Sequence, residues 1–482
     1  MLASARRELV GACALDWRAA LVSDAALEVE VTAAAADAPA AAAGALRCRL
    51  DLVASPADAM VPLAAPTVEL LMSNAHAAAR SRARDFYLYC QRWWDELAQA
   101  GPAQSAHAAN DSNVRLFAVD ERGRRRCVCS FLPRAAATAA ATGRLVHSPR
   151  HAARIVNLIP YAARRGVGGG GGGDSGGAQW LSAHTFLAQR RGGAAEHALL
   201  LAALLCGFGL DAYVCLGEIR DDDAAGAAAA AGGDAQPRRS SRAHAWVATY
   251  FGPHAAQRVT FWEPLTGARV AAPAHPFVTL SCVFNAQSLY ANKQPDHRLA
   301  HTALDLGDAG AWKALAPERI AAAAAHDDLS ADVALLPSPL DAAAAAVELE
   351  AALRASIAQH RAQLGLSTTF DDGLSYVLQA ALAAYEAERV AGVAFGGAEF
   401  EDAVRRAVPD GHCFKGHPAC FAHADPTHVF GALRAGALSG EILATVGDNT
   451  RFALRVQAHA YAEASVAVWV MLAVRYQPLR SL

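Results

Sequence analysis

A glycine break, an apolar helix and three strand-like runs follow one another in the middle of the sequence. Residues 191–193, Arg-Gly-Gly, interrupt one helical pattern, and the apolar run 194–208 forms a second that ends at Gly207 and Gly209. Alternating apolar and polar runs come next, at residues 212–217, 244–250 and 259–262. Helices followed by a group of strands predict an α+β fold.

The amino-acid composition argues against several classes of protein. At about 100–200 residues per domain, 482 residues predict two to four domains. The hydrophobic content of 54% reflects alanine runs such as residues 321–325, and alanine favours helices rather than membrane insertion. The longest apolar stretch, residues 197–207, is shorter than the roughly 18 residues of a membrane span, so we expect none. The net charge of −3 argues against nucleic acid as a partner.

The amino terminus and the cysteines indicate the compartment. Residues 1–10 contain Arg6 and Arg7, but no apolar stretch with a cleavage site follows them, so we expect no secretion signal. Ten cysteines are spread over the chain without a dense framework, which is typical of reduced thiols. We therefore expect a reducing compartment, the cytosol or the nucleus.

The first 160 residues contain patterns for a small sheet, a long helix and a hairpin. The alternating runs 17–22, 26–31 and 46–54 predict three antiparallel strands. Three short strands are too few to bury the face of a sheet, so we expect this segment to be the end of a β-sandwich. Residues 66–101 predict one amphipathic helix. Its paired Trp93 and Trp94 form either an interaction surface or, as we favour, an aromatic end that docks on the next domain. The remaining patterns are a hairpin over residues 114–132 and a helix over 149–158.

Two segments of low complexity interrupt these elements, at residues 166–177 and 221–240. The first contains the unbroken glycine run 168–173. A phosphate-binding loop is one interpretation, but such loops need glycines at set offsets and a positioned Lys-Ser/Thr or helix start. We favour a surface insertion.

The last third of the sequence predicts a separate α+β domain after an alanine-rich connector. Its predicted helices are residues 340–364, 370–390 and 399–408, and its predicted strands are 442–445, 451–460 and 465–476. A cluster of possible zinc ligands comprises His412, Cys413, His417, Cys420, His423 and His428. No pair of these cysteines has the spacing of a zinc knuckle, so we favour a loop with incidental histidines and predict no metal.

The strands after the apolar helix contain residues of catalytic type. His244-Ala245-Trp246 and Trp262-Glu263 resemble the transglutaminase-like branch of the papain-like cysteine enzymes. The resemblance implies a nucleophilic cysteine at the start of the helix, a histidine base on a strand and a carboxylate on the next strand. Here His244 fills the base position and Glu263 the carboxylate position, but Ala194 occupies the nucleophile position. A methyl group cannot attack a carbonyl, and Cys206 is about 18 Å further along the helix. The resemblance implies a vestigial triad.

Longer stretches together resemble the centrosomal protein of 76 kDa family over residues 17–475. They are residues 85–94, 150–157, 197–217, 259–270, 282–285, 371–374, 403–416 and 465–476. The resemblance implies residues 1–60 as the C-terminal part of a C2-like β domain, 61–112 as a helical connector, 113–313 as a transglutaminase-like domain, 314–339 as a linker and 340–482 as a C-terminal α+β domain.

The resemblance also implies a function. The expected protein is a non-catalytic scaffold of the centrosome or centriole, in the cytoplasm and cytoskeleton, that regulates centriole duplication through centriolar protein partners. It would need no cofactor, and its vestigial cleft could hold a peptide. Two alternatives stay open: a scaffold of the ciliary transition zone or axoneme, and an active cysteine-type hydrolase or transferase with another nucleophile.

Overall fold

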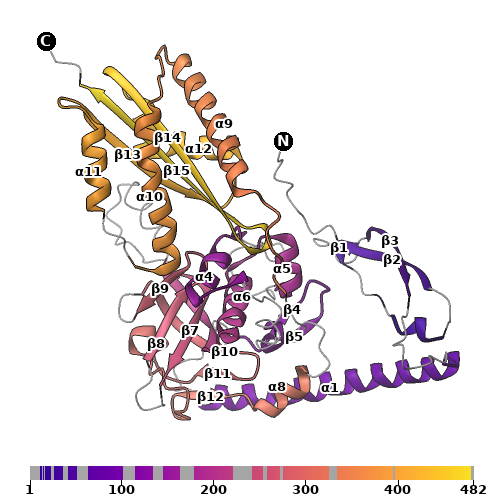
Figure 1. The fold of residues 1–482 in the computed structure, drawn as a ribbon. Coiled ribbons are helices and arrows are strands. Elements are labelled where there is room, and N and C mark those ends of the chain that lie inside the picture. Colours follow the sequence, from indigo (N-terminus) through magenta and orange to yellow (C-terminus); the bar gives the residue numbers. More distant parts are fainter. Residues whose placement is uncertain are drawn as a thin grey trace. The chain divides into compact units, whose positions relative to one another are not determined.

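The computed structural model describes residues 11–12, 15, 17–22, 27–35, 42–51, 63–100, 114–133, 145–162, 179–220, 241–252, 258–271, 275–324, 334–393 and 397–478. The glycine-rich segment 166–177, the insertion 221–240 and the amino-terminal residues 1–10 lie outside the described residues. The chain folds as two compact units, shown as ribbons in Figure 1. Among the described residues, the larger unit comprises those within Arg7–Ala140 and Tyr161–Val333, and the smaller unit comprises those within Ala141–Pro160 and Ala334–Leu482. Both are mixtures of helices and strands, so the predicted α+β class is confirmed.

The larger unit begins with a three-stranded antiparallel sheet of order β1-β2-β3. Its strands are β1 (Gly11–Ala12), β2 (Leu27–Ala35) and β3 (Ala42–Leu50). The predicted strand 17–22 is wrong, because Trp17–Val22 forms the 3₁₀ helix η1. Ala20 is buried while Trp17 is 54% exposed, and the segment packs on the helix that follows, so helical spacing suits it better than alternation.

The long helix α1 (Ala65–Ala100) confirms the helix predicted for residues 66–101. Towards its end Phe86, Cys90 and Trp93 are buried at helical spacing. Trp93 Nε1 donates a hydrogen bond to the Ala314 carbonyl at 2.8 Å, close to the helix α8 (Pro317–Ala324). The docking interpretation is therefore confirmed for Trp93.

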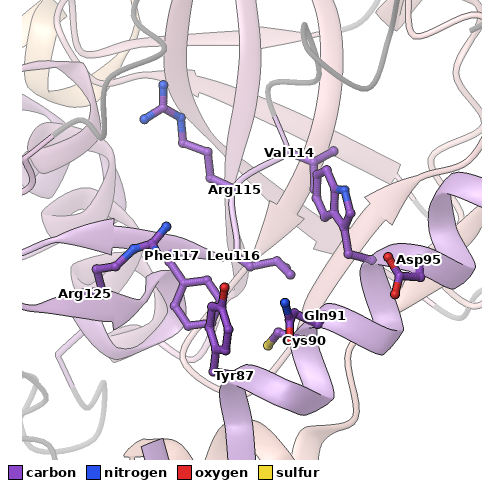
Figure 2. A pocket seen from close by; sticks show the side chains of 10 residues that line it. Tyr87, Cys90, Gln91, Asp95, Val114, Arg115, Leu116, Phe117 and Arg125 are labelled. Carbon is purple, nitrogen blue, oxygen red and sulfur yellow. The ribbon is translucent and has the colours of Figure 1, made fainter. Parts of the chain in front are cut away.

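The predicted hairpin forms between residues 114 and 132. Strands β4 (Phe117–Val119) and β5 (Arg125–Cys127) pair antiparallel, and the 3₁₀ helix η2 (Val128–Phe131) continues the second strand. Residues 114–117 face α1 across a pocket that is drawn in Figure 2.

An antiparallel seven-stranded sheet of order β12-β11-β10-β6-β7-β8-β9 forms the centre of the larger unit. The strands are β6 (Asp211–Arg220), β7 (Ser241–Phe251), β8 (Arg258–Glu263), β9 (Ala268–Ala271), β10 (Phe277–Phe284), β11 (Leu289–Asn292) and β12 (Trp312–Ala314). Helix α5 (Ala183–Gln189) precedes the buried helix α6 (Ala194–Gly207), which contacts β6 and β7. The predicted helix 194–208 and the three predicted strands after it are confirmed. The 3₁₀ helix η5 (Leu299–His301) follows β11 and contacts β10.

The smaller unit is a three-layer structure around the sheet β13-β15-β14. Its elements are α4 (Pro149–Asn157), α9 (Ala342–Gln363), α10 (Asp372–Ala391), α11 (Ala398–Ala407), β13 (Cys413–Phe421), α12 (Pro426–Ala435), α13 (Ala437–Leu443), β14 (Asp448–Ala460), η7 (Ala462–Ala464) and β15 (Val466–Gln477). Alternate residues of β15 enter different cores: Val468 and Val470 pack with α9, α12 and α13, whereas Trp469 and Met471 pack with α10. Because both faces are covered, the strand is apolar almost throughout.

Two predictions for this region are corrected. Residues 442–445 are not a strand, because Ile442 and Leu443 end helix α13, where Ser439, Ile442 and Leu443 are buried at helical spacing. So short an apolar run does not distinguish helix from strand. Helix α4, which the predicted boundaries place in the 113–313 domain, groups with the smaller unit.

Candidate functional site

The glycine break fixes the start of α6. A Cβ atom on Gly192 would lie 2.7 Å from two ring carbons of Phe186, so α5 can approach this closely only because residue 192 has no side chain. Gly193 is the extended N-cap, and Ala194 is the first residue of the helix. At this position the unpaired backbone amides and the helix dipole would favour a thiolate, but the chain supplies a methyl group.

A carboxylate from the first turn, that of Glu196, binds a backbone amide at the start of α6. Its Oε2 accepts a hydrogen bond from the Gly193 amide at 2.9 Å, and its Oε1 accepts one from the Leu181 amide at 3.1 Å. The carboxylate is buried and therefore supplies the negative charge that the helix terminus favours. Our sequence interpretation missed this role, although a glutamate three residues after an N-cap is the capping-box spacing.

His244 and Glu263 are brought together as predicted. His244 Nε2 lies 2.8 Å from Glu263 Oε2, and the side chains are only 1% and 7% exposed. Glu263 Oε1 accepts a hydrogen bond from the Leu265 amide at 3.1 Å. The contact follows from topology, because β7 and β8 are antiparallel neighbours.

The other ring nitrogen of this histidine is unsatisfied. Among the described residues, His244 Nδ1 has no hydrogen-bond partner. Buried polar atoms are nearly always hydrogen-bonded, and those that are not often mark a functional position. The ring lies nearly parallel to Phe277 at 6.4 Å, and Phe277 stacks on Trp246 at 4.3 Å, so an aromatic surface holds the imidazole in place.

Gly217 allows the strands to close around this pair. It is the cross-strand partner of His244, and a Cβ atom there would lie 2.0 Å from the Thr279 carbonyl oxygen. The irregular register of β10 beside it brings that carbonyl close. Only glycine fits this position.

Cys90, Cys206 and Cys282 of the larger unit are poor nucleophiles. Burial raises the pKa of Cys90 and that of Cys282 to about 12. Burial also raises the pKa of Cys206, whose thiol donates to the Ala212 carbonyl. These thiols are protonated at neutral pH and are therefore inert. No disulfide bond joins the cysteines in the part of the chain that the structure describes.

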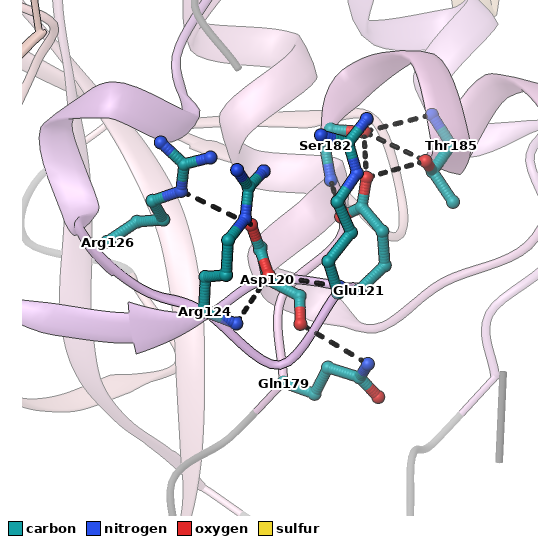
Figure 3. A network of polar contacts seen from close by, with 8 residues as sticks. Asp120, Glu121, Arg124, Arg126, Gln179, Ser182 and Thr185 are labelled. Atoms are coloured by element: carbon teal, nitrogen blue, oxygen red, sulfur yellow. Dashed lines mark hydrogen bonds and ion pairs between the residues drawn. The ribbon is translucent and has the colours of Figure 1, made fainter. Parts of the chain in front are cut away.

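The hairpin contains two buried carboxylates, of which Asp120 binds arginines of the hairpin itself and Glu121 holds the start of α5 (Figure 3). Asp120 is fully buried, and its Oδ2 accepts from Arg124 Nε and Arg126 Nε at 3.0 and 3.2 Å. Glu121 accepts from the amide and hydroxyl of Ser182, the N-cap of α5, at 3.0 and 2.7 Å. The sequence contained no signal for this role, because the partners are 61 residues apart.

The sequence predicted that the cluster of histidines and cysteines between residues 412 and 428 lies in a loop, and this prediction is wrong. Cys413, His417 and Cys420 lie on strand β13, and His428 lies on α12 with Nδ1 2.9 Å from Asp425 Oδ2. No group of three or more His, Cys, Asp or Glu side chains within the described ranges could hold a metal ion.

One carboxylate in the smaller unit accepts four hydrogen bonds. Arg154 donates to both oxygens of Glu386, from Nε at 2.9 Å and from Nη2 at 2.7 Å. Trp469 Nε1 donates to Oε2 at 2.6 Å, and the Tyr461 hydroxyl donates to Oε1. The cluster joins α4, α10 and β15 and has the character of a structural ion pair.

The larger unit contains a peptidase-like domain, in which a buried helix is followed by an antiparallel sheet that contains a buried His–Glu pair. Residues 178–315 match the family model described as the CEP76 peptidase-like domain, and residues 338–477 match the centrosomal protein of 76 kDa C-terminal domain. The chain belongs to the centrosomal protein of 76 kDa family.

Relatives in vertebrates have the same name, centrosomal protein of 76 kDa. The chain is 37% identical to the Xenopus tropicalis protein over 82% of this chain and 57% of that one. It is 34% identical to the Homo sapiens protein over 97% of this chain and 68% of that one, and 34% identical to the Danio rerio protein with the same coverage. The alignments thus span between half and about two thirds of the length of these relatives.

Proposed function

We propose that this chain is a non-catalytic scaffold of the centrosome, in the cytoplasm and cytoskeleton, that regulates centriole duplication by binding other centriolar proteins. The names of its relatives support the location. The observation that carries the proposal is a buried His244–Glu263 pair in a domain whose nucleophile position is Ala194.

Three features of the site support the loss of catalysis. Ala194 cannot form a covalent intermediate, and the unsatisfied Nδ1 of His244 is the atom that would face a thiol in such a site. Glu196 adds a negative charge at the helix start, where a thiolate would need a positive environment. Burial raises the pKa of Cys206, the cysteine on the same helix, so that residue does not support the alternative of an active cysteine enzyme.

The remaining parts of the proposal follow from the family. We propose that the first sheet, β1-β2-β3, is the end of a C2-like domain and that residues 340–482 are a partner-binding domain. A peptide is the ligand that the vestigial cleft would hold. Within the ranges that the structure describes, no helix is both long and apolar enough to cross a membrane.

A paired variant tests whether the vestigial pair contributes to function. A tagged chain with His244→Ala and Glu263→Ala should reach the centrosome and restrain centriole duplication as the unaltered chain does, in cells depleted of their own protein. The matched control is His301→Ala with Asp296→Ala, an exposed His–Asp pair whose Nδ1 and Oδ2 atoms are 2.6 Å apart. A chain that ends at residue 313 should lose targeting, because the C-terminal domain is removed.

Stability must be measured together with targeting. Removing a buried hydrogen bond costs about 1–3 kcal/mol, so thermal melts are needed to show that the double variant is folded. A folded double variant that loses control of centriole number, while the truncated chain keeps it, would contradict the scaffold proposal. Labelling near His244 by a cysteine-reactive probe would support the enzyme alternative instead.

A further inference from the structure

A second candidate site lies in the larger unit, at the pocket between α1 and residues 114–117. Its volume is about 480 Å³, which is within the range of small-molecule and side-chain sites. Figure 2 shows helix α1 on one side and the strand that leads into β4 on the other. No role for this pocket follows from the family or from the vestigial pair.

The pocket is lined by apolar and aromatic side chains. Val114, Leu116 and Cys90 in the lining are buried, whereas Tyr87 remains 43% exposed. The rings of Tyr87 and Phe117 are 6.0 Å apart and tilted by 46°, and Trp94 lines the same pocket. Aromatic rings that are partly exposed at such an angle can accept a further ring edge-to-face.

The charges around the pocket are unequal. Arg115 and Arg125 supply two positive charges, and Asp95 supplies one negative charge. The Arg125 guanidinium lies 6.0 Å from the centre of the Phe117 ring and has no ion pair among the described residues. Its neighbours Arg124 and Arg126 both bind Asp120, whereas Arg125 lines the pocket and is placed to meet a ligand there. In Figure 2 Asp95 lies on the opposite side of the pocket from Arg125.

We propose that this pocket binds a partner peptide in which an aromatic side chain is followed by acidic residues. The aromatic side chain would enter between Tyr87, Trp94 and Phe117, and the acidic residues would pair with Arg125 and Arg115. Aromatic anchors in desolvated pockets with a charged rim are the usual energetic centres of interfaces. The site is distinct from the His244–Glu263 pair, so it does not depend on whether that pair is vestigial.

Binding of short labelled peptides to the full chain tests the proposal. The probe is fluorescein-Gly-Ser-Phe-Glu-Glu-amide, measured by fluorescence anisotropy at low salt. The comparison peptides replace Phe with Ala or both Glu residues with Lys. We expect saturable binding of the first peptide and at least tenfold weaker binding of both others.

Two variants locate the binding site. The Arg125→Glu variant should bind the acidic peptide at least tenfold more weakly and the Lys peptide more tightly. The Tyr87→Ala variant should bind both peptides more weakly, because each contains the aromatic side chain. The matched control Arg258→Glu makes the same charge change at the exposed first residue of strand β8 and should have no effect. Absence of saturable binding by the acidic peptide overturns the proposal, as does equal binding by Arg125→Glu. Failure here leaves the centrosomal assays of the double variant unchanged, so the two proposals fail separately.

Discussion

The first turn of α6 shows how one residue can make a helix start unsuitable for a nucleophile. Glu196 accepts the Gly193 amide, and its Oε2 would lie 3.1 Å from a Cβ atom on that glycine. The carboxylate therefore lies beside the N-cap residue that directly precedes residue 194. In cysteine enzymes the same place is electropositive, because amide donors and the dipole stabilise a thiolate.

A cysteine placed at position 194 should not by itself confer catalysis. We expect Ala194→Cys to give a thiol with a pKa at or above the ordinary value of about 8.5 and no measurable peptide hydrolysis, because Glu196 repels the thiolate. The additional change Glu196→Gln should lower the thiol pKa by about one pH unit. The rate of alkylation by iodoacetamide as a function of pH measures both values. Rapid hydrolysis by the single variant would show that substrate machinery has been retained.

Whether the contacts of a single residue could be predicted depended on how far apart the two partners lie in the sequence. The contact between His244 and Glu263 could be predicted, because the resemblance to transglutaminase-like enzymes implies a base and a carboxylate on adjacent strands, and β7 and β8 are such neighbours. The unsatisfied Nδ1 of His244 and the bonds from Glu121 to Ser182 could not, because they depend on how distant segments pack.

At the scale of elements, the length of a periodic pattern decided whether a helix or strand was predicted correctly. Helix α1 and strand β15 were predicted correctly from long patterns, but the six-residue run 17–22 and the four-residue run 442–445 were not. In both failures the segment packs on a neighbouring element through a helical face, and tertiary packing overrides a short alternation.

The Glu386 cluster, which joins three elements, predicts a dependence of stability on pH. Burial raises the pKa of Glu386, but the bonds from Arg154, Tyr461 and Trp469 outweigh it and lower the pKa below its ordinary value of 4.5. The ionised group therefore stabilises the folded state above pH 4.5, and this contribution is lost as the pH falls through the lowered pKa.

We expect Glu386→Gln to lower the free energy of unfolding by about 1.5–3 kcal/mol at pH 7. The difference from the unaltered chain should shrink as the pH falls below 4.5, because the unaltered carboxyl group is then protonated too. Urea unfolding at several pH values measures it. Exposed Glu348→Gln on α9 is the control and should change stability little at any pH. A difference that stays constant down to acid pH would show that the charge of Glu386 contributes nothing.

At the scale of the whole molecule, the smaller unit is discontinuous in sequence. Its predicted boundary was residue 340 and the family model begins at residue 338, yet α4 from residues 149–157 belongs to it. Sequence patterns identify segments one after another, so a helix that joins a domain almost 200 residues later cannot be assigned from its own pattern. Arg154 explains the grouping, since it is buried and holds both oxygens of Glu386.

A fragment of residues 334–478 should consequently be destabilised and should be rescued by α4 added separately. Without Arg154 the buried Glu386 charge is left uncompensated, which costs about 3–5 kcal/mol of folding free energy. We expect a synthetic peptide of residues 145–162 to bind the fragment and raise its melting temperature in proportion to peptide concentration. The same peptide with Arg154→Ala should give little or no increase, whereas an Arg150→Ala peptide, which loses the same charge, should retain most of it. Thermal melts of the fragment with each peptide make the comparison. Equal stabilisation by the two variant peptides, or a fragment as stable as the full chain, would mean that α4 docks on the unit without completing it.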